Sequence, residues 1–142
     1  AAGGFGHVGL QESLSMIADA LGWRLDDIRQ SIEPVIAETA CQTEFLKVEP
    51  NHVAGLRQVI QGIRSGEPVI TLDFRAYVDA EGPEDRIIID GVPPIDMTIK
   101  GGIHGDYATA AIAVNAVPKV VAHSPGLVTM KDIPVLSAMP AR

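Results

Sequence analysis

The chain has 142 residues, of which 46% are hydrophobic, 20% charged and 4% aromatic, and its formal net charge is −7. This length suits one domain with a single core, and the apolar share is too high for a disordered chain. The sequence contains no run of the ~18 apolar residues that a membrane-spanning helix needs, and no cluster of basic residues. We therefore expect a cytoplasmic protein that binds neither nucleic acid nor membranes. Because Cys41 is the only cysteine, an internal disulfide and a cysteine-rich zinc site are excluded.

Apolar residues at helical spacing predict a first helix over residues 8–21. The residues on this apolar stripe are Leu10, Leu14, Ile17, Ala18 and Leu21. Gly22 is well placed to end the helix in a left-handed conformation. A second, shorter helix is predicted over residues 25–31, and Pro34 would end it because proline disfavours a helical conformation at the preceding residue.

The middle of the chain changes to a period of two, which is typical of strands. Apolar and polar residues alternate over 69–78, and the preceding run 56–64 is compatible with a partner strand. The segment 65–67 between them, Ser-Gly-Glu, predicts a hairpin turn. Further strands are predicted at 86–90 and 95–100, and a weaker one at 35–40.

Helical spacing returns in the last third of the chain, where Asp106 could cap a helix that continues to Val121. Pro118 lies inside this helix, so we expect a kink there or a break just before it. An extended tail with several prolines follows from Leu127. Helices, antiparallel strands and a final helix together predict an α+β fold, in which helices pack on one face of a mostly antiparallel (or mixed) sheet.

The second face of the predicted sheet also carries apolar residues. Val59, Ile60 and Ile63 in one strand, and the isoleucines at 87–89 in another, place apolar groups on both faces. The simplest explanation is that a second copy of the chain covers this face, so we expect it to be used for oligomerisation. The alternative is a short chain with a few exposed isoleucines.

A glycine-rich segment, Gly4-Phe5-Gly6-His7-Val8-Gly9, precedes the first predicted helix. It has the Gly-x-Gly-x-x-Gly spacing of a dinucleotide-binding turn, but that mechanism requires a strand before the turn, and only three residues precede Gly4. A minimal nucleotide-binding enzyme built on this segment stays open as one alternative. A glycine-rich approach to a helix N-terminus also exposes N–H groups that can hold a carboxylate or phosphate, and a flexible entry loop is the further alternative.

Two of the four histidines, His7 and His104, lie in glycine-rich turns that each precede a predicted helix. Glycine lets a backbone come close to a ligand, and loops at helix starts commonly carry function. Both are therefore candidates for contact with a ligand. The histidines lack a metal-ligand spacing with one another or with carboxylates, so we expect no metal site.

Three segments of the chain carry a resemblance to a known family. They are Gly6-His7-Val8-Gly9-Leu10, Gly101-Gly102-Ile103-His104-Gly105-Asp106 with the helix after it, and the tail Pro125-Gly126-Leu127-Val128-Thr129-Met130-Lys131-Asp132. Together they resemble the C-terminal domain of 2,4-diaminopentanoate dehydrogenase-like proteins, which are relatives of dihydrodipicolinate reductase. The resemblance spans nearly the whole chain and is loose between residues 41 and 100.

The resemblance implies a division of labour between two domains. An N-terminal Rossmann domain would bind NAD or NADP, and the C-terminal domain would contact the substrate and build the oligomer. Residues 1–142 would then be a single C-terminal substrate-binding and oligomerisation domain, and the N-terminal domain would be a missing partner. The reaction implied is the oxidative deamination of a diamino acid-like substrate, or its reverse, by hydride exchange with the nicotinamide. Alone, the chain should bind no cofactor and be inactive.

The resemblance also suggests which residues form the site. In the reductase relatives the start of the corresponding helix holds a substrate carboxylate, which points by position to His7, Val8 and Gly9. We expect His7 and His104 to make polar substrate or proton-transfer contacts. The further predicted substrate-binding residues are Gly105, Asp106, Thr109 and Lys131, with Lys131 or Asp132 closing the site or the interface. The His-His-x-x-Lys segment of the reductases is not in this sequence, so their proton donor has no counterpart here.

The expected partners are a small amino or keto acid and one or three further copies of the chain, in a dimer or tetramer. The alternative function is a non-catalytic module that binds a small carboxylate or serves assembly.

Overall fold

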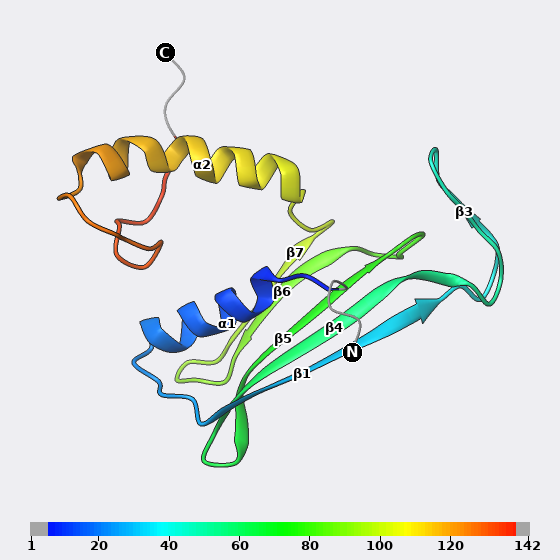
Figure 1. Ribbon diagram of the computed structural model, residues 1–142, viewed down its shortest axis with the longest axis horizontal. Helices are drawn as coiled ribbons and strands as arrows, with labels where there is room; N and C mark the ends of the chain where they lie inside the picture. The colour runs from blue at the N-terminus through cyan, green and yellow to red at the C-terminus, as the bar shows by residue number, and fades with distance from the viewer. Residues whose placement is uncertain (1–5, 139–142) are drawn as a thin grey trace. The chain divides into compact units, whose positions relative to one another are not determined.

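The structure, a computed structural model, describes residues 6–138, so Gly4 and Phe5 of the first glycine-rich segment lie outside the described residues. The chain forms two compact units, Ala1–Ala80 and Glu81–Arg142. Within the described residues every strand pair is antiparallel, and a helix accompanies the strands of each unit (Figure 1). The predicted α+β class is therefore confirmed.

The first unit is built on a three-stranded sheet with the order β1-β4-β5. Its strands are β1 (Asp27–Ile36), β4 (Val53–Arg64) and β5 (Glu67–Tyr77), and two short strands, β2 (Cys41–Gln42) and β3 (Lys47–Val48), pair separately. The predicted hairpin between β4 and β5 is confirmed. Its two turn residues both have positive φ, 54° at Ser65 and 86° at Gly66, as a type I′ turn requires.

The predicted second helix over residues 25–31 is wrong, because most of this segment belongs to β1. Ile28 and Ile32 are four residues apart, a spacing that fits one face of a helix and one face of a strand equally well. Pairing with β4, in which Ile28 lies opposite Gly62 and Ile32 opposite Gln58, decides for the strand. Pro34 is tolerated because β1 is an edge strand. The backbone N–H that proline lacks is not needed there for a hydrogen bond in the centre of the sheet.

The first helix, α1 (Gly9–Ala20), covers one face of this sheet over β4 and β5 (Figure 1). Leu14 of α1 and Ile60 of β4 are fully buried between the two layers. Gly62 lets the Leu25 side chain lie close to β4, since a Cβ on Gly62 would be 2.8 Å from a methyl carbon of Leu25. Gly22 ends the helix with φ +66°, which confirms the predicted left-handed stop.

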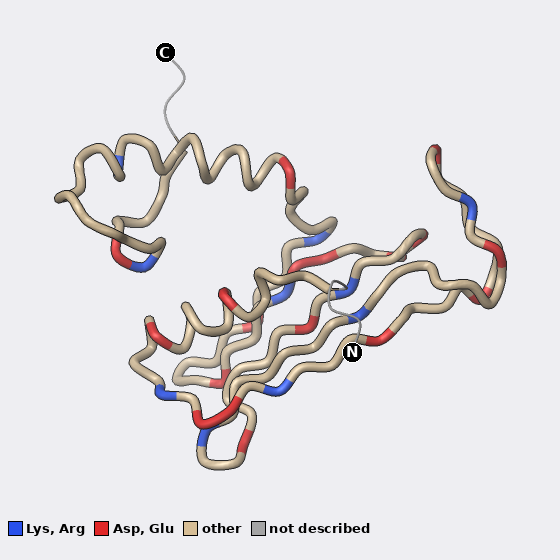
Figure 2. The backbone as a smooth tube through the Cα atoms, in the orientation of Figure 1, with Lys and Arg blue, Asp and Glu red and all other residues tan. Residues whose placement is uncertain are grey.

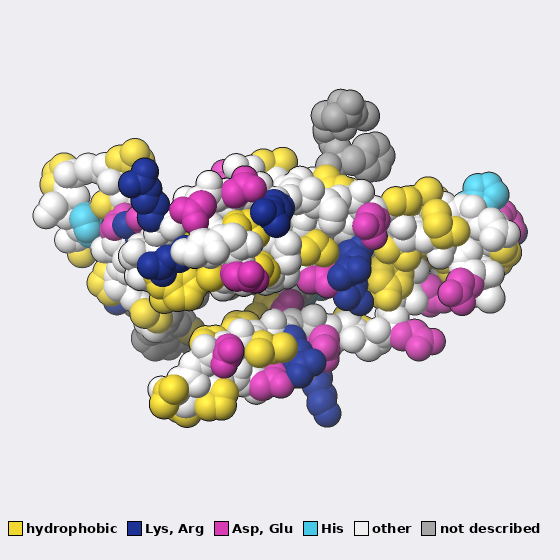
Figure 3. Space-filling view, turned by 90° about the horizontal axis from the view of Figure 1, so that it is seen from below, with side chains coloured by type: hydrophobic (Ala, Val, Ile, Leu, Met, Phe, Trp, Pro, Cys, Tyr) yellow, Lys and Arg dark blue, Asp and Glu magenta, His cyan; other side chains and the backbone are white. Residues whose placement is uncertain are grey.

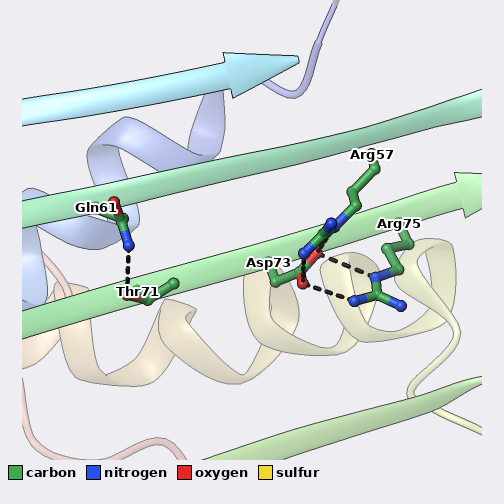
Figure 4. A network of polar contacts seen from close by, with 5 residues as sticks. All are labelled: Arg57, Gln61, Thr71, Asp73 and Arg75. Carbon is green, nitrogen blue, oxygen red and sulfur yellow. Dashed lines mark hydrogen bonds and ion pairs between the residues drawn. The ribbon is translucent and has the colours of Figure 1, made fainter. Parts of the chain in front are cut away.

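The opposite face of the sheet carries a network of polar side chains beside the apolar residues Val59 and Ile63. Strand alternation places Arg57 and Gln61 of β4, and Thr71, Asp73 and Arg75 of β5, on this face, where they form hydrogen bonds and ion pairs (Figure 4). Of the three residues named from β4, Ile60 is buried on the side of α1, whereas strand alternation places Val59 and Ile63 on the same face as Gln61. The partly exposed isoleucines of β1, Ile28 and Ile32, instead share the side of Gln58 and Gly62 that faces α1. Use of the polar face in oligomerisation stays a prediction.

The second unit contains a β-hairpin and a helix. The strands β6 (Glu84–Ile89) and β7 (Ile95–Lys100) match the predicted strands, and Arg86 and Asp96 form an ion pair across them with an Nη2–Oδ2 distance of 2.6 Å. The helix α2 (Gly105–Ala122) continues through Pro118, so the predicted alternative of a break before this residue is wrong. The N-cap residue of α2 is His104 and not the predicted Asp106, which lies in the first turn. In the described part of the chain, neither helix is long and apolar enough to cross a bilayer.

Candidate functional site

The segment before α1 is held to the sheet by a single buried side chain, Gln58 of β4. The Oε1 atom of Gln58 accepts a hydrogen bond from the backbone N–H of His7 at 2.6 Å, and its Nε2 atom donates to the His7 carbonyl at 3.3 Å. Gly6 precedes this contact with φ +120°, and a Cβ at this position would lie 2.8 Å from the Gln58 Oε1 atom. The glycine is therefore needed for both its backbone angle and its lack of a side chain.

The imidazole of His7 is held in place by two further residues. Its ring meets Phe74 of β5 edge to face, with the centroids 5.2 Å apart and the planes at 61°. A Cβ on Gly9 would lie only 2.8 Å from the His7 Cε1 atom and 3.1 Å from its Nδ1 atom. The ring occupies the space that the absent side chain leaves, and the residue as a whole is exposed.

The N-terminus of α1 lies directly beside this histidine. Val8 is the N-cap residue, has a helical backbone conformation and is 83% exposed, and no side chain of the described residues caps the helix. N–H groups of a first turn attract anions. Glu12 also lies in the first turn and adds negative charge there. His7, Val8 and Gly9, three of the predicted site residues, are thus neighbours at one exposed helix start.

The second glycine-rich turn connects β7 to α2 in the second unit. Gly101 and Gly102 both have positive φ, 83° and 68°, and the Gly102 N–H donates to the carbonyl of Ile99 at 3.1 Å. The Asp85 carboxylate of β6 accepts a hydrogen bond from the Ile103 N–H at 2.8 Å. The two left-handed glycines and the Asp85 carboxylate together stabilise the turn that leads to His104 and the start of α2.

His104 stands at the start of α2 with its ring against Tyr107, at a centroid distance of 4.6 Å and a tilt of 42°. Its carbonyl accepts the N–H of Ala108 at 2.9 Å, which closes the first turn of the helix. Gly105, Asp106 and Thr109 follow within two turns, and all three are exposed. His104 and Tyr107 therefore form a small aromatic pair on the exposed surface of this turn.

Lys131 lies in the tail, beside a turn that Asp132 stabilises. The Asp132 carboxylate accepts hydrogen bonds from the hydroxyl and the N–H of Thr129, at 2.7 and 2.8 Å, and the hydroxyl bond, with the backbone bond second, lowers the pKa of Asp132. The Lys131 Nζ atom is 3.8 Å from the Asp132 Oδ1 atom. These contacts give Asp132 a structural role in its own turn.

The structure thus brings the predicted residues together in two separate groups. The first group, in the first unit, is His7, Val8 and Gly9, and the second, in the second unit, is His104, Gly105, Asp106 and Thr109. Reasoning from the sequence missed the residues that hold each group, namely Gln58 and Phe74 in the first and Asp85 and Tyr107 in the second. The one available signal was alternation, which places Gln58 on the same strand face as the apolar Leu56 and Ile60. Among residues 6–138, no cluster of three or more His, Cys, Asp or Glu could hold a metal ion.

The helix that carries His104 is apolar around most of its circumference. Along α2 charge is confined to Asp106 in the first turn and Lys119 in the last, as the coloured tube of Figure 2 shows. None of its residues is buried, and Ile112, Val117 and Val121 are 47%, 58% and 80% exposed. Elsewhere, on the face seen in Figure 3, acidic and basic side chains are interspersed with hydrophobic ones. A helix with so few charged residues is normally buried against other elements.

Comparison with known proteins identifies the family. The family model described as "2,4-diaminopentanoate dehydrogenase C-terminal domain" matches residues 3–142. The chain is 37% identical over 139 residues to a 2,4-diaminopentanoate dehydrogenase from Acetoanaerobium sticklandii, covering 94% of this chain and 39% of that protein. It is 28% identical over 146 residues to an amine dehydrogenase from Streptomyces virginiae, covering 89% of this chain and 41% of that protein.

A solved structure, that of an amine dehydrogenase from Mycobacterium smegmatis, has a similar fold. It superimposes with a TM-score of 0.78 and 24% identity, over 94% of this chain and 40% of that chain. At this identity the likeness concerns the fold alone. The chain spans about two fifths of the length of the curated relatives that it matches. It belongs to the family of 2,4-diaminopentanoate dehydrogenase C-terminal domains.

Proposed function

We propose that this chain is the substrate-binding and oligomerisation domain of an NAD(P)-dependent amine dehydrogenase. The enzyme would oxidatively deaminate a diamino acid-like substrate, or catalyse the reverse reaction. The observation that carries the proposal is a histidine at an exposed helix start, His7, which Gln58 and Phe74 orient, in a chain that belongs to this family. A site for chemistry needs side chains that are oriented before the substrate arrives, and His7 meets that condition.

The chain's own residues would bind the substrate and move protons. The imidazole rings of His7 and His104 would accept or donate a proton at a substrate nitrogen. The uncapped N–H groups of α1 at Val8 and Gly9 would hold a substrate carboxylate. Asp106 and Thr109, exposed beside His104, would orient the substrate's polar groups, with Gly105 leaving room and Lys131 closing the site.

The nicotinamide, which would accept or donate the hydride, does not fit the residues described here. Dinucleotide sites are built at the carboxyl ends of parallel strands in a βαβ unit. In residues 6–138 all strand pairs are antiparallel, so these residues form no such unit. We therefore assign the cofactor to a separate N-terminal domain, and the relatives' greater length, with the chain covering only 39% and 41% of them, supports this.

The amount of exposed surface supports further protein partners. The chain exposes 11262 Å². Two separate compact globules of the size of its two units would together expose only ~8,500 Å². This difference holds whatever the placement of the units, and the apolar surface of α2 contributes to it. The N-terminal domain and one or three further copies of the chain are the partners that we propose for this surface.

Two measurements test the proposed function. Titration of the isolated chain with NADH and NADPH should show no binding, and a micromolar affinity would contradict the division between domains. In the full-length protein, His104→Ala should lower kcat/KM for the amine by more than about tenfold if the ring transfers a proton. The control is His52→Ala, because His52 is exposed and its ring contacts only the nearby Pro50 carbonyl in the side-chain hydrogen bonds of the described residues. Equal rates for the two variants would contradict the role of His104.

A further inference from the structure

Gln58 stands apart from the other polar residues of the sheet. It lies in the central strand β4, opposite Phe74 of β5 and Ile32 of β1, and it is 3% exposed. Among the described residues it is the one polar or charged residue that is buried. A buried amide must find hydrogen-bond partners inside the protein, so its location needs an explanation.

Both polar atoms of the Gln58 side-chain amide form hydrogen bonds with the backbone of one residue, His7. The N–H of His7 can only donate and its carbonyl can only accept, so Oε1 must face the former and Nε2 the latter. Two parallel bonds from one planar amide fix the orientation of the His7 backbone, as a neighbouring strand would. The two residues are 51 positions apart in the sequence, so the contact joins the glycine-rich segment to the centre of the sheet.

The ring of His7 is directed by the same arrangement. Once the backbone is fixed, the Phe74 ring and the space left by Gly9 confine the imidazole. Gly6 permits the approach, because a Cβ there would meet both Gln58 and Ile32 at 2.8 Å. The exposed side chain of His7 is thus oriented by the buried side chain of Gln58.

We propose that Gln58 is a positioning residue that aims the His7 imidazole at the substrate through its two hydrogen bonds to the His7 backbone. This inference rests on the proposed function, in which His7 contacts the substrate. Gln58 itself is buried, so it would act through His7 and not by contact with the substrate.

The test uses Gln58→Met in the full-length protein, since methionine keeps the volume and removes both hydrogen bonds. The matched control is Gln61→Met, three residues along the same strand on the polar face, where the Gln61 amide donates to the Thr71 hydroxyl. In Gln58→Met, the NMR signals of ¹³C-labelled His7 should lose the ring-current shift from Phe74, and Gln61→Met should leave them unchanged. An unchanged His7 signal in Gln58→Met overturns the proposal.

A double-mutant cycle separates positioning from a general effect on folding. Gln58→Met alone should lower kcat/KM at least about tenfold, whereas added to His7→Ala it should change kcat/KM by less than about twofold. An equal loss in both backgrounds overturns the positioning role. Full activity of His7→Ala alone overturns instead the proposed function of His7, and the NMR result identifies which of the two has failed.

Gln58→Glu keeps the test decisive if the methionine variant does not fold. A carboxylate can accept from the His7 N–H but cannot donate to its carbonyl, whereas the protonated acid can do both. The His7 signals should therefore differ from wild type at neutral pH and approach wild type at the same acidic pH. Signals that match wild type at every pH overturn the proposal.

Discussion

Arg57 of β4 and Arg75 of β5 lie directly opposite each other in the register of the sheet, two like charges on neighbouring strands. Such a pair is unfavourable by itself. Asp73, two residues before Arg75, accepts hydrogen bonds from both guanidinium groups, at 2.8 and 3.0 Å from Arg57 and at 2.9 and 3.2 Å from Arg75 (Figure 4). The Asp73 carboxylate thus offsets the repulsion between the two arginines.

We predict that Asp73→Asn lowers the unfolding midpoint, because the two arginines lose the charge between them. The side chains are partly exposed, so the loss should be on the order of 1 kcal/mol, or a few degrees in Tm. Thermal unfolding followed by circular dichroism measures it. The control is Asp27→Asn, whose carboxylate contacts a single arginine at 3.4 Å and should matter less. Equal shifts for the two variants would contradict the bridging role.

The ion pairs of Asp73 predict how the free energy of unfolding depends on pH. Hydrogen bonds from Arg57, and next from Arg75, hold the pKa of Asp73 well below its ordinary value of 3.8. A lowered pKa in the folded state stabilises the fold above the unfolded pKa, and this stabilisation is lost as the pH falls toward the folded pKa. The difference in unfolding free energy between wild type and Asp73→Asn should be constant above about pH 5 and shrink below it. A difference that grows in acid would contradict this assignment.

Local patterns were sufficient for the elements whose structure depends on nearby residues. The alternation over β5, the turn at Ser65 and Gly66 and the stripe of α1 each express a short-range preference, and each is confirmed. The segment of β1 was predicted as a helix because its isoleucine spacing suits both periods. Only pairing with β4 decides between them, and its partners lie further along the chain, from Ile63 opposite Asp27 to Val53 opposite Ile36.

The candidate site was predictable only in part for the same reason. Glycines before helices pointed to His7 and His104, since such turns have a local signature. The contact of Gln58 with His7, 51 residues apart, has none. The polar network on the sheet was also missed, because only the pairing of β4 with β5 places Arg57 on the same face as Asp73 and Arg75.

We predict that Gly55→Ala destabilises the first unit by about 1–3 kcal/mol. A Cβ on Gly55 would overlap the Ala76 carbonyl oxygen and the Tyr77 backbone of β5. Backbone atoms cannot move aside as a flexible side chain can, so the two strands would have to separate. Chemical denaturation measures the change. Gly91→Ala is the control, because its nearest neighbours would lie at an ordinary 3.6 Å, and a similar loss there would contradict the steric explanation.

We predict that Ser65→Asn stabilises the β4–β5 hairpin by about 0.5–1 kcal/mol. Ser65 has φ +54°, a left-handed conformation that asparagine adopts more readily than serine, and the following Gly66 completes the preferred Asn-Gly pair. The Ser65 N–H, which donates to the Asp26 carboxylate at 2.6 Å, is kept in the variant. Ser65→Val should have the opposite effect, since a β-branched residue resists positive φ. Unfolding midpoints that shift in the same direction would contradict the type I′ assignment.

Gly9→Ala should separate stability from activity. Gly9 is the first residue of α1, and alanine favours helices over glycine by about 1 kcal/mol at most positions, so the unfolding midpoint should hold or rise. The new methyl group would nevertheless lie 2.8 Å from the His7 Cε1 atom, and the imidazole, as the free end of a side chain, would turn away from Phe74. We therefore expect kcat/KM of the full-length enzyme to fall about tenfold while the fold is retained. Ser13→Ala, an exposed position on the same helix, controls for the gain in helix propensity. If Gly9→Ala kept full activity while the His7 signals moved, the orientation of this ring would be irrelevant to turnover.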